Sequence, residues 1–214
     1  VNLPAPLDPE LIPYLDLAEK LGRIAISLAR WNVRAIEVKC SGEITGKDVK
    51  ILVSGVVAGV LTPMIEEGNV NLINALNIAR SRKINVLSVT SEASPKFASL
   101  LEVTIASDDS TCSIAGPLFP GTGPRIVQVQ GHAVEFEPKG IFLFTEHRDR
   151  PGVIGEVGTL LGQNNINIAH MDVARDQPRG SAIMILNLDD EAAPEILQQL
   201  KASPNMTEVT QIVL

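Results

Sequence analysis

The stretch HRDRPGVIGEVGTLLGQNNINI, which begins at His147, has the residue types and spacing that suit the binding of a small anion. Pro151 fits the first turn of a helix, because the N–H group that proline lacks would be unpaired there. Gly152 has no Cβ, so another group can approach its backbone closely. The N–H groups at 152–154 carry a partial positive charge that favours a carboxylate or a phosphate. We therefore expect a small-anion site that includes Gly152 and Val153.

Polar side chains near this helix start could hold the other groups of an amino acid. Asp149 in the preceding turn and Asn167 at the start of the next strand offer oxygen atoms to an ammonium group. His147 could bind a hydroxyl group of the ligand. The alternative is structural: Asp149 or Arg150 caps the helix and Asn167 fills a turn, since an aspartate before a helix is common.

The elements that must position these residues follow from hydrophobic periodicity. The pattern predicts two helices, at 153–161 and 194–201, and four strands, at 141–146, 166–173, 181–188 and 206–214. The order strand, helix, strand, strand, helix, strand is that of the ferredoxin-like βαββαβ unit, in which two helices pack on one face of an antiparallel sheet. We therefore expect one domain at 141–214.

The residues before this domain predict a second α+β domain at 1–138, after a proline-containing linker at 1–7 that would lead from an absent catalytic part. The fold class is thus α+β, and the EPKG segment at 137–140 is the expected boundary. Periodicity predicts helices at 9–31, 47–67 and 69–83, and strands at 33–40, 84–89, 100–106, 111–119 and 125–136. Asp108 and Asp109 are expected in a turn between strands.

Composition and charge exclude several classes of protein. The net charge of −7 and the absence of a basic run argue against nucleic acid. Cys40, Cys112 and three scattered histidines lack metal-ligand spacing, so no metal site is expected. The apolar run at 51–65 is shorter than the roughly 20 residues that span a bilayer, and no signal peptide is recognised. We expect no membrane partner and a cytoplasmic location.

Two further patterns concern cofactors and anions. The G-x-G-x-x-G fingerprint of a dinucleotide site is absent, so this chain is expected to bind no NAD and to hold no catalytic residue. The segment GTGPR, which ends at Arg125, could bind a phosphate through its backbone N–H groups and the arginine, with His132 as a weaker candidate. A plain Gly-Pro hairpin turn is the alternative for this segment.

The segment RDRPGVIGEVGTLLGQNNINIAHMDVARD resembles the ACT domain, an amino-acid-sensing module of metabolic enzymes. Together with VNLPAP, LAEKLGRIA, NVNLINA and GPLFPGTGPRIVQVQGHAVEFEPKG, it resembles the C-terminal regulatory part of the long-form D-3-phosphoglycerate dehydrogenase family. The resemblance implies an allosteric substrate-binding domain followed by an ACT domain that binds L-serine at an ACT–ACT interface. His147, Asp149 and Asn167 match the serine-contacting positions, although the family often has asparagine at position 149.

The same resemblance implies that the parent enzyme uses NAD, that the ACT domains form a homodimer, and that the parent is a homotetramer. It also implies that a basic residue before the IVQ segment, here Arg125, helps to form an anion site. We expect bound L-serine to shift the conformational equilibrium of an attached dehydrogenase. The alternative is a stand-alone amino-acid-binding module, or a purely structural dimerisation module with no effector.

Overall fold

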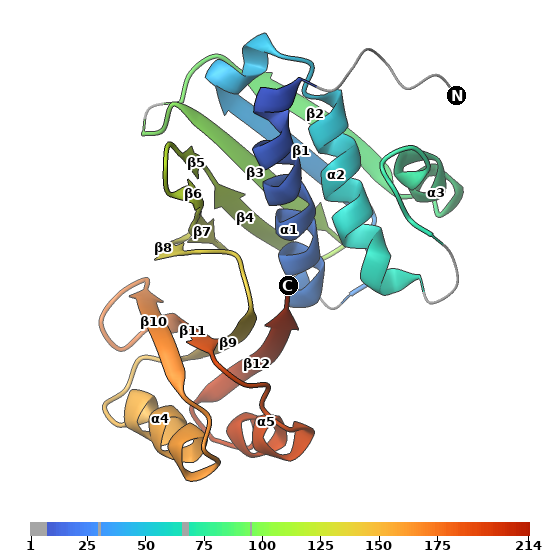
Figure 1. The fold of residues 1–214 in the computed structure, drawn as a ribbon. Coiled ribbons are helices and arrows are strands. Elements are labelled where there is room, and N and C mark those ends of the chain that lie inside the picture. Colours follow the sequence, from blue (N-terminus) through green and yellow to red (C-terminus); the bar gives the residue numbers. More distant parts are fainter. Residues whose placement is uncertain (1–7, 30, 66–68, 95) are drawn as a thin grey trace. The chain divides into compact units, whose positions relative to one another are not determined.

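The computed structural model describes residues 8–29, 31–65, 69–94 and 96–214. Contacts within the chain divide it into two compact units, residues 1–131 and 132–214 (Figure 1). The unit boundary thus falls between Gly131 and His132, whereas the sequence-based boundary at 137–140 stays a prediction. Both units combine helices and strands, so the predicted α+β class is confirmed.

The first unit is a mixed sheet with helices on one face. β1 pairs with β2 in parallel and with β3 antiparallel, and the strands of this unit follow the order β2-β1-β3-β4-β7. Its helices are α1 (Ile12–Ala29), α2 (Lys50–Leu61) and α3 (Ala75–Ser81), with 3-10 turns η1 (Pro9–Leu11), η2 (Glu43–Gly46) and η3 (Thr62–Met64). Its strands are β1 (Ala35–Gly42), β2 (Asn85–Ser91), β3 (Ser99–Ala106), β4 (Thr111–Gly116), β5 (Leu118–Phe119), β6 (Gly123–Pro124) and β7 (Ile126–Val129).

Helices α1 and α2 lie side by side on this sheet because glycines let their backbones approach (Figure 1). A Cβ at Gly22 would lie 2.2 Å from the carbonyl oxygen of Val56, and one at Gly59 would lie 2.1 Å from that of Glu19. Any larger residue would therefore force the helices apart. Every residue of α2 from Leu52 to Leu61 is buried, as expected for its apolar sequence.

Several predicted elements of the first unit are shorter than expected. α2 stops at Leu61, because Pro63 follows in a 3-10 turn. The helix predicted at 69–83 is only α3, since the side chain of Asn71 accepts hydrogen bonds from the N–H groups of Ile73 and Asn74 and forms a turn instead. The strand predicted at 125–136 is a hairpin, with Gln130 and Gly131 at positive φ in its turn. None of the helices among the described residues is long and apolar enough to cross a membrane.

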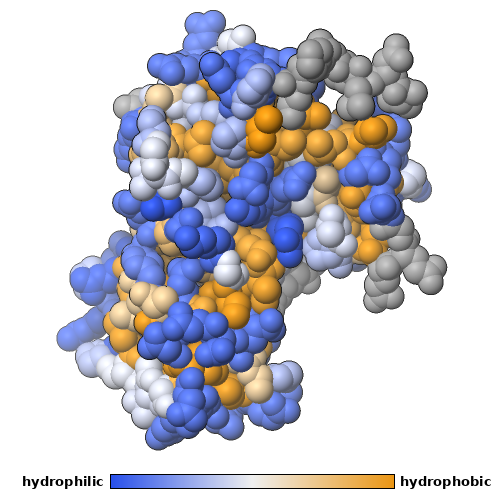
Figure 2. All heavy atoms as spheres, viewed as in Figure 1, coloured by the Kyte–Doolittle hydropathy of each residue, from blue (hydrophilic) through white to orange (hydrophobic). Residues whose placement is uncertain are grey.

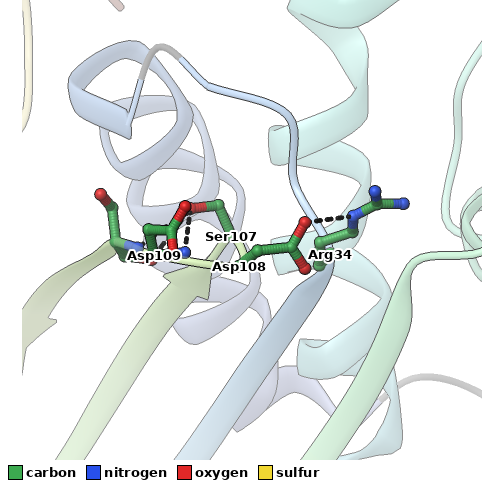
Figure 3. A network of polar contacts seen from close by, with 5 residues as sticks. Arg34, Ser107, Asp108 and Asp109 are labelled. Carbon is green, nitrogen blue, oxygen red and sulfur yellow. Dashed lines mark hydrogen bonds and ion pairs between the residues drawn. The ribbon is translucent and has the colours of Figure 1, made fainter.

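The turn expected at Asp108 and Asp109 is confirmed between β3 and β4 (Figure 3). The hydroxyl oxygen of Ser107 accepts hydrogen bonds from the N–H groups of Asp109 and Ser110, at 3.3 and 3.0 Å. Asp108 Oδ2 accepts a hydrogen bond from Arg34 Nε at 3.3 Å. Because this ion pair is exposed, it adds little stability, and the network is a turn rather than a site.

The second unit begins with β8 (His132–Phe136) and continues as the predicted βαββαβ fold. The elements are β9 (Ile141–Arg148), α4 (Val153–Gln163), β10 (Ile168–Arg175), β11 (Ser181–Leu188), α5 (Pro194–Lys201) and β12 (Met206–Val213). The four main strands form an antiparallel sheet in the order β10-β11-β9-β12. The predicted order of strands and helices is confirmed.

One face of this sheet carries the core of the second unit. Its buried residues come from both helices and from the three strands β11, β9 and β12, and they include Val157, Leu161, Ile196, Leu200, Leu143, Met184, Leu186 and Val209. In the edge strand β10, Met171 and Val173 are exposed, whereas Asp172 accepts a hydrogen bond from the N–H of Glu135 in β8 at 2.6 Å. Figure 2 shows apolar side chains at the surface of this unit, in the lower half of the view.

Candidate functional site

The start of α4 is open to solvent on one side. Gly152 has φ +98°, a left-handed conformation that glycine adopts without strain, and no side chain caps the helix. A Cβ at Gly152 would meet no atom within 4 Å. The side chain of Val153 is buried, and its N–H group makes only a long contact of 3.4 Å with the carbonyl oxygen of Arg150. The first turn can therefore accept a ligand atom near its backbone.

Asp149 is held by residues of the β10–β11 hairpin. Its Oδ2 accepts hydrogen bonds from Arg175 Nη1 at 2.8 Å and from the backbone N–H of Arg179 at 2.9 Å. These two bonds, with that of Arg179 the larger cause, hold the pKa of the Asp149 carboxyl below its usual range. The carboxylate is thus charged and partly exposed, and Oδ2 already has two donors.

His147 lies on the helix-covered face of the sheet, beneath the start of α4. On β9 it lies on the same face as Thr145 and Leu143, and its cross-strand partner is Ala182. The ring is buried, and its Nδ1 lies 3.3 Å from Thr145 Oγ1. Burial lowers the pKa of His147 below its usual value, and the nearby Asp149 charge opposes this shift. Burial thus favours the neutral form of the ring.

A cavity of about 410 Å³ joins the α4 start to the β10–β11 hairpin. It is lined by Asp149, Arg150, Pro151, Gly152, Ile154, Arg175, Pro178 and Arg179. Two of the predicted site residues, Asp149 and Gly152, thus meet in one cavity. Val153 directly follows in the chain, although its side chain turns into the core.

Asn167 lies at the other end of the same sheet. In the strand register, Ala182 is level with both Arg175 and His147, whereas Leu188 is level with Ile168. Asn167 therefore lies about seven to eight residues along the sheet from the cavity, roughly 25 Å at ~3.3 Å per residue. There its amide donates to Asp189 Oδ2 at 2.7 Å. One chain cannot bring Asn167 and Asp149 to the same small ligand.

The weaker anion candidates have partners of their own. Arg125 Nη1 donates to the carbonyl oxygens of Pro124 and Thr122, at 3.1 and 3.5 Å, within the GTGPR turn. His132 Nδ1 lies 3.4 Å from Asp176 Oδ1. A histidine next to a carboxylate is poorly suited to bind an anion, so His132 is the weaker of the two. Within the part of the chain that the structure describes, no group of three His, Cys, Asp or Glu side chains could hold a metal ion.

Comparison with known families defines the class of the second unit. Residues 141–205 match the family model of the ACT domain. Residues 10–130, more than half of the chain, match that of the D-3-phosphoglycerate dehydrogenase intervening domain. The chain therefore belongs to the D-3-phosphoglycerate dehydrogenase family, and the resemblance found in its motifs is confirmed.

Curated relatives agree with this family. D-3-phosphoglycerate dehydrogenases of Archaeoglobus fulgidus and Methanocaldococcus jannaschii are 37% and 36% identical to this chain, each over 100% of its length. That of Bacillus subtilis is 31% identical, again over 100% of the chain. The matched part is 41%, 40% and 41% of these three relatives, so the chain spans about 40% of their length.

The sequence did not point to two arginines of the cavity. Arg175 and Arg179 lie in the segment ARDQPRG, 26 and 30 residues after Asp149, and the strand register brings them to its carboxylate. Two arginines around a turn are a visible pattern, but only the sheet order places that turn beside α4.

Proposed function

We propose that this chain is the regulatory and oligomerisation part of a cytoplasmic, NAD-dependent D-3-phosphoglycerate dehydrogenase of L-serine biosynthesis. Its ACT domain binds L-serine between two copies of the chain. The observation that carries this proposal is the separation of Asp149 and Asn167 at opposite ends of one sheet. Two side chains that suit the same ligand, yet cannot meet within one chain, can meet across a twofold axis.

The edge strand β10 supports such pairing. Its outer edge has no strand partner in the sheet order, and Met171 and Val173 are 41% and 38% exposed. Ile154, on α4, is 47% exposed. An edge strand with exposed apolar side chains is suited to extend its sheet by a second copy.

Antiparallel pairing of two β10 strands would also complete the ligand site. Such a pairing places the start of one strand beside the end of the other, so the partner's Asn167 would approach the end of β10 at Arg175, and with it Asp149. The ligand carboxylate would bind at the first turn of α4, and its ammonium would bind Asp149 Oδ1 and the partner's Asn167. Because these groups belong to two chains, bound L-serine would favour the closed dimer and so bias an attached enzyme.

Calorimetric titration of the chain with L-serine tests the proposal. We expect a saturable heat that D-serine does not reproduce, and the loss of this heat in Asp149→Ala. The variant Asp109→Ala, in an exposed turn of the first unit, is the matched control and should bind as the original chain does. A chain that dimerises but gives no heat with L-serine would refute sensing and support a structural dimerisation module.

That structural module is the second candidate, and one observation favours it. Asp149 already receives two hydrogen bonds from its own chain, as a purely structural residue would. For the first unit we propose only that Arg125 binds an anion or the substrate. His132, the weaker anion candidate, lies in the second unit. NAD binding and catalysis would belong to other parts of the parent enzyme. Serine bound to the ACT domain would regulate them allosterically.

A further inference from the structure

The cavity at the start of α4 carries more positive charge than an amino acid needs. Of the described residues that line it, Arg150, Arg175 and Arg179 are cationic and Asp149 is the only acidic one. A zwitterionic amino acid brings one positive and one negative charge, so it leaves the excess of arginine charge uncompensated. All three arginines are exposed, and their combined charge gives the cavity a positive potential that favours an anionic ligand.

The hydrogen bonds in the cavity determine which arginines remain available. Arg175 is bound to Asp149, and Arg179 uses only its backbone N–H for the same carboxylate. Among the described residues, no carboxylate lies within ion-pair distance of the guanidinium groups of Arg150 or Arg179. Two guanidinium groups therefore line the cavity without an acidic partner.

We propose, on the basis of the L-serine site suggested above, that this cavity includes a phosphate subsite formed by Arg150 and Arg179. Its preferred ligand is an amino acid esterified with phosphate rather than the free amino acid. A guanidinium group can donate two parallel hydrogen bonds to a phosphate, and the two arginines match the charge of a phosphate monoester dianion. The carboxylate and ammonium groups would keep the positions given to L-serine.

The size of the cavity agrees with a ligand larger than serine. The cavity of about 410 Å³ is open to solvent between the start of α4 and the β10–β11 hairpin, so it leaves room for a ligand larger than serine. Arg150 and Arg179 come from these two sides, one from each loop. The two loops that flank the cavity therefore each supply one arginine to its lining.

Titration of the full chain with three probes tests this inference. We expect O-phospho-L-serine to bind at least about tenfold more tightly than L-serine, and inorganic phosphate to bind more weakly than O-phospho-L-serine. In Arg150→Gln and Arg179→Gln, O-phospho-L-serine should lose about tenfold in affinity while L-serine changes less than about twofold. The second variant keeps the backbone N–H that binds Asp149, and thermal unfolding checks that both variants fold.

The outcomes separate this inference from the proposed function. Arg82→Gln, an exposed arginine after α3 in the first unit, is the matched control and should leave all affinities unchanged. Tighter binding of L-serine than of O-phospho-L-serine would overturn the phosphate subsite and leave the serine site standing. Equal binding of inorganic phosphate and O-phospho-L-serine would overturn it in favour of a plain anion pocket. Binding of none of the probes would overturn both proposals.

Discussion

The glycines of the two units serve opposite purposes. In the first unit, a Cβ at Gly22 or Gly59 would lie within 2.2 Å of the backbone of the neighbouring helix. In the second unit, the glycines of α4, at positions 155, 158 and 162, would gain a Cβ that meets nothing within 4 Å. The glycines of α1 and α2 thus allow these two helices to pack closely. The space beside the glycines of α4, in contrast, is not filled by other atoms of the same chain.

The two units resemble each other more in their edge strands than in their helices. β2 in the first unit and β10 in the second each expose apolar side chains, Leu87 and Val89 in β2 and Met171 and Val173 in β10. β10 ends beside a polar cavity at the start of α4, whereas the cavity along β2 adjoins the end of α3 at Arg80 and Lys83. We therefore propose that the dimer forms through β10, and substitutions in the two strands test this proposal.

The largest effect is expected from a charge placed on β10. Val173→Lys should weaken dimerisation by about 100-fold or more, because a lysine would lose water at a packed apolar interface. Sedimentation velocity measures the dimer over a range of chain concentrations. Leu87→Lys, an equally exposed residue of the edge strand β2, is the control and should leave the dimer intact. The reverse pattern would move the interface to the first unit.

The close packing of α1 and α2 predicts a large loss of stability when Gly59 gains a side chain. Gly59→Ala should lower the free energy of unfolding by about 3 kcal/mol, because its Cβ would collide with backbone atoms that no side-chain rotation can move. Urea unfolding followed by circular dichroism gives this value. A loss under about 0.5 kcal/mol would show that α1 and α2 are not in close contact.

The buried ring of His147 predicts an effect of pH on the stability of the second unit. Its folded pKa lies below the usual 6.5, so the unfolded chain binds more protons once the pH falls below about 6.5. Stability should fall by at most about 1.4 kcal/mol per pH unit in this range, and should not change through this group at higher pH. Melting temperatures from pH 7.5 to 5 should decline less steeply in His147→Gln. Parallel declines would contradict the burial of a neutral ring.

The smallest effect is expected for a glycine of α4. In the monomeric Val173→Lys background, Gly158→Ala should raise the free energy of unfolding by about 0.5–1 kcal/mol, since alanine favours a helix and meets nothing there. Gly158→Ala without Val173→Lys, in a chain that can still dimerise, then shows whether a partner covers α4. A loss of stability in the monomer would remove the contrast between the two units.

Much of the second unit could be predicted from sequence because each element has a strong period and a clear start. Pro151 and Gly152 mark the beginning of α4, and β11 contains an unbroken apolar run from Ala182 to Leu186. The turn at Gln130 was missed, because glutamine rarely adopts positive φ and gives no turn signal. The partners of Asp149 were missed too, since they depend on strand register. The separation of Asp149 from Asn167, in contrast, follows from the connection itself: a helix that leaves the end of one strand returns the chain to the start of the next.

A complementation titration tests the central claim, that the L-serine site is shared by two chains. Asp149→Ala and Asn167→Ala are each expected to abolish L-serine binding. After the two variants are unfolded together and refolded as a mixture, a mixed dimer has one site with both native residues and one with neither. We predict that the mixture regains L-serine binding at about one quarter of a molecule per chain, the statistical share for random dimers. Binding in the original chain but none in the mixture would contradict the account and place the whole site within one chain.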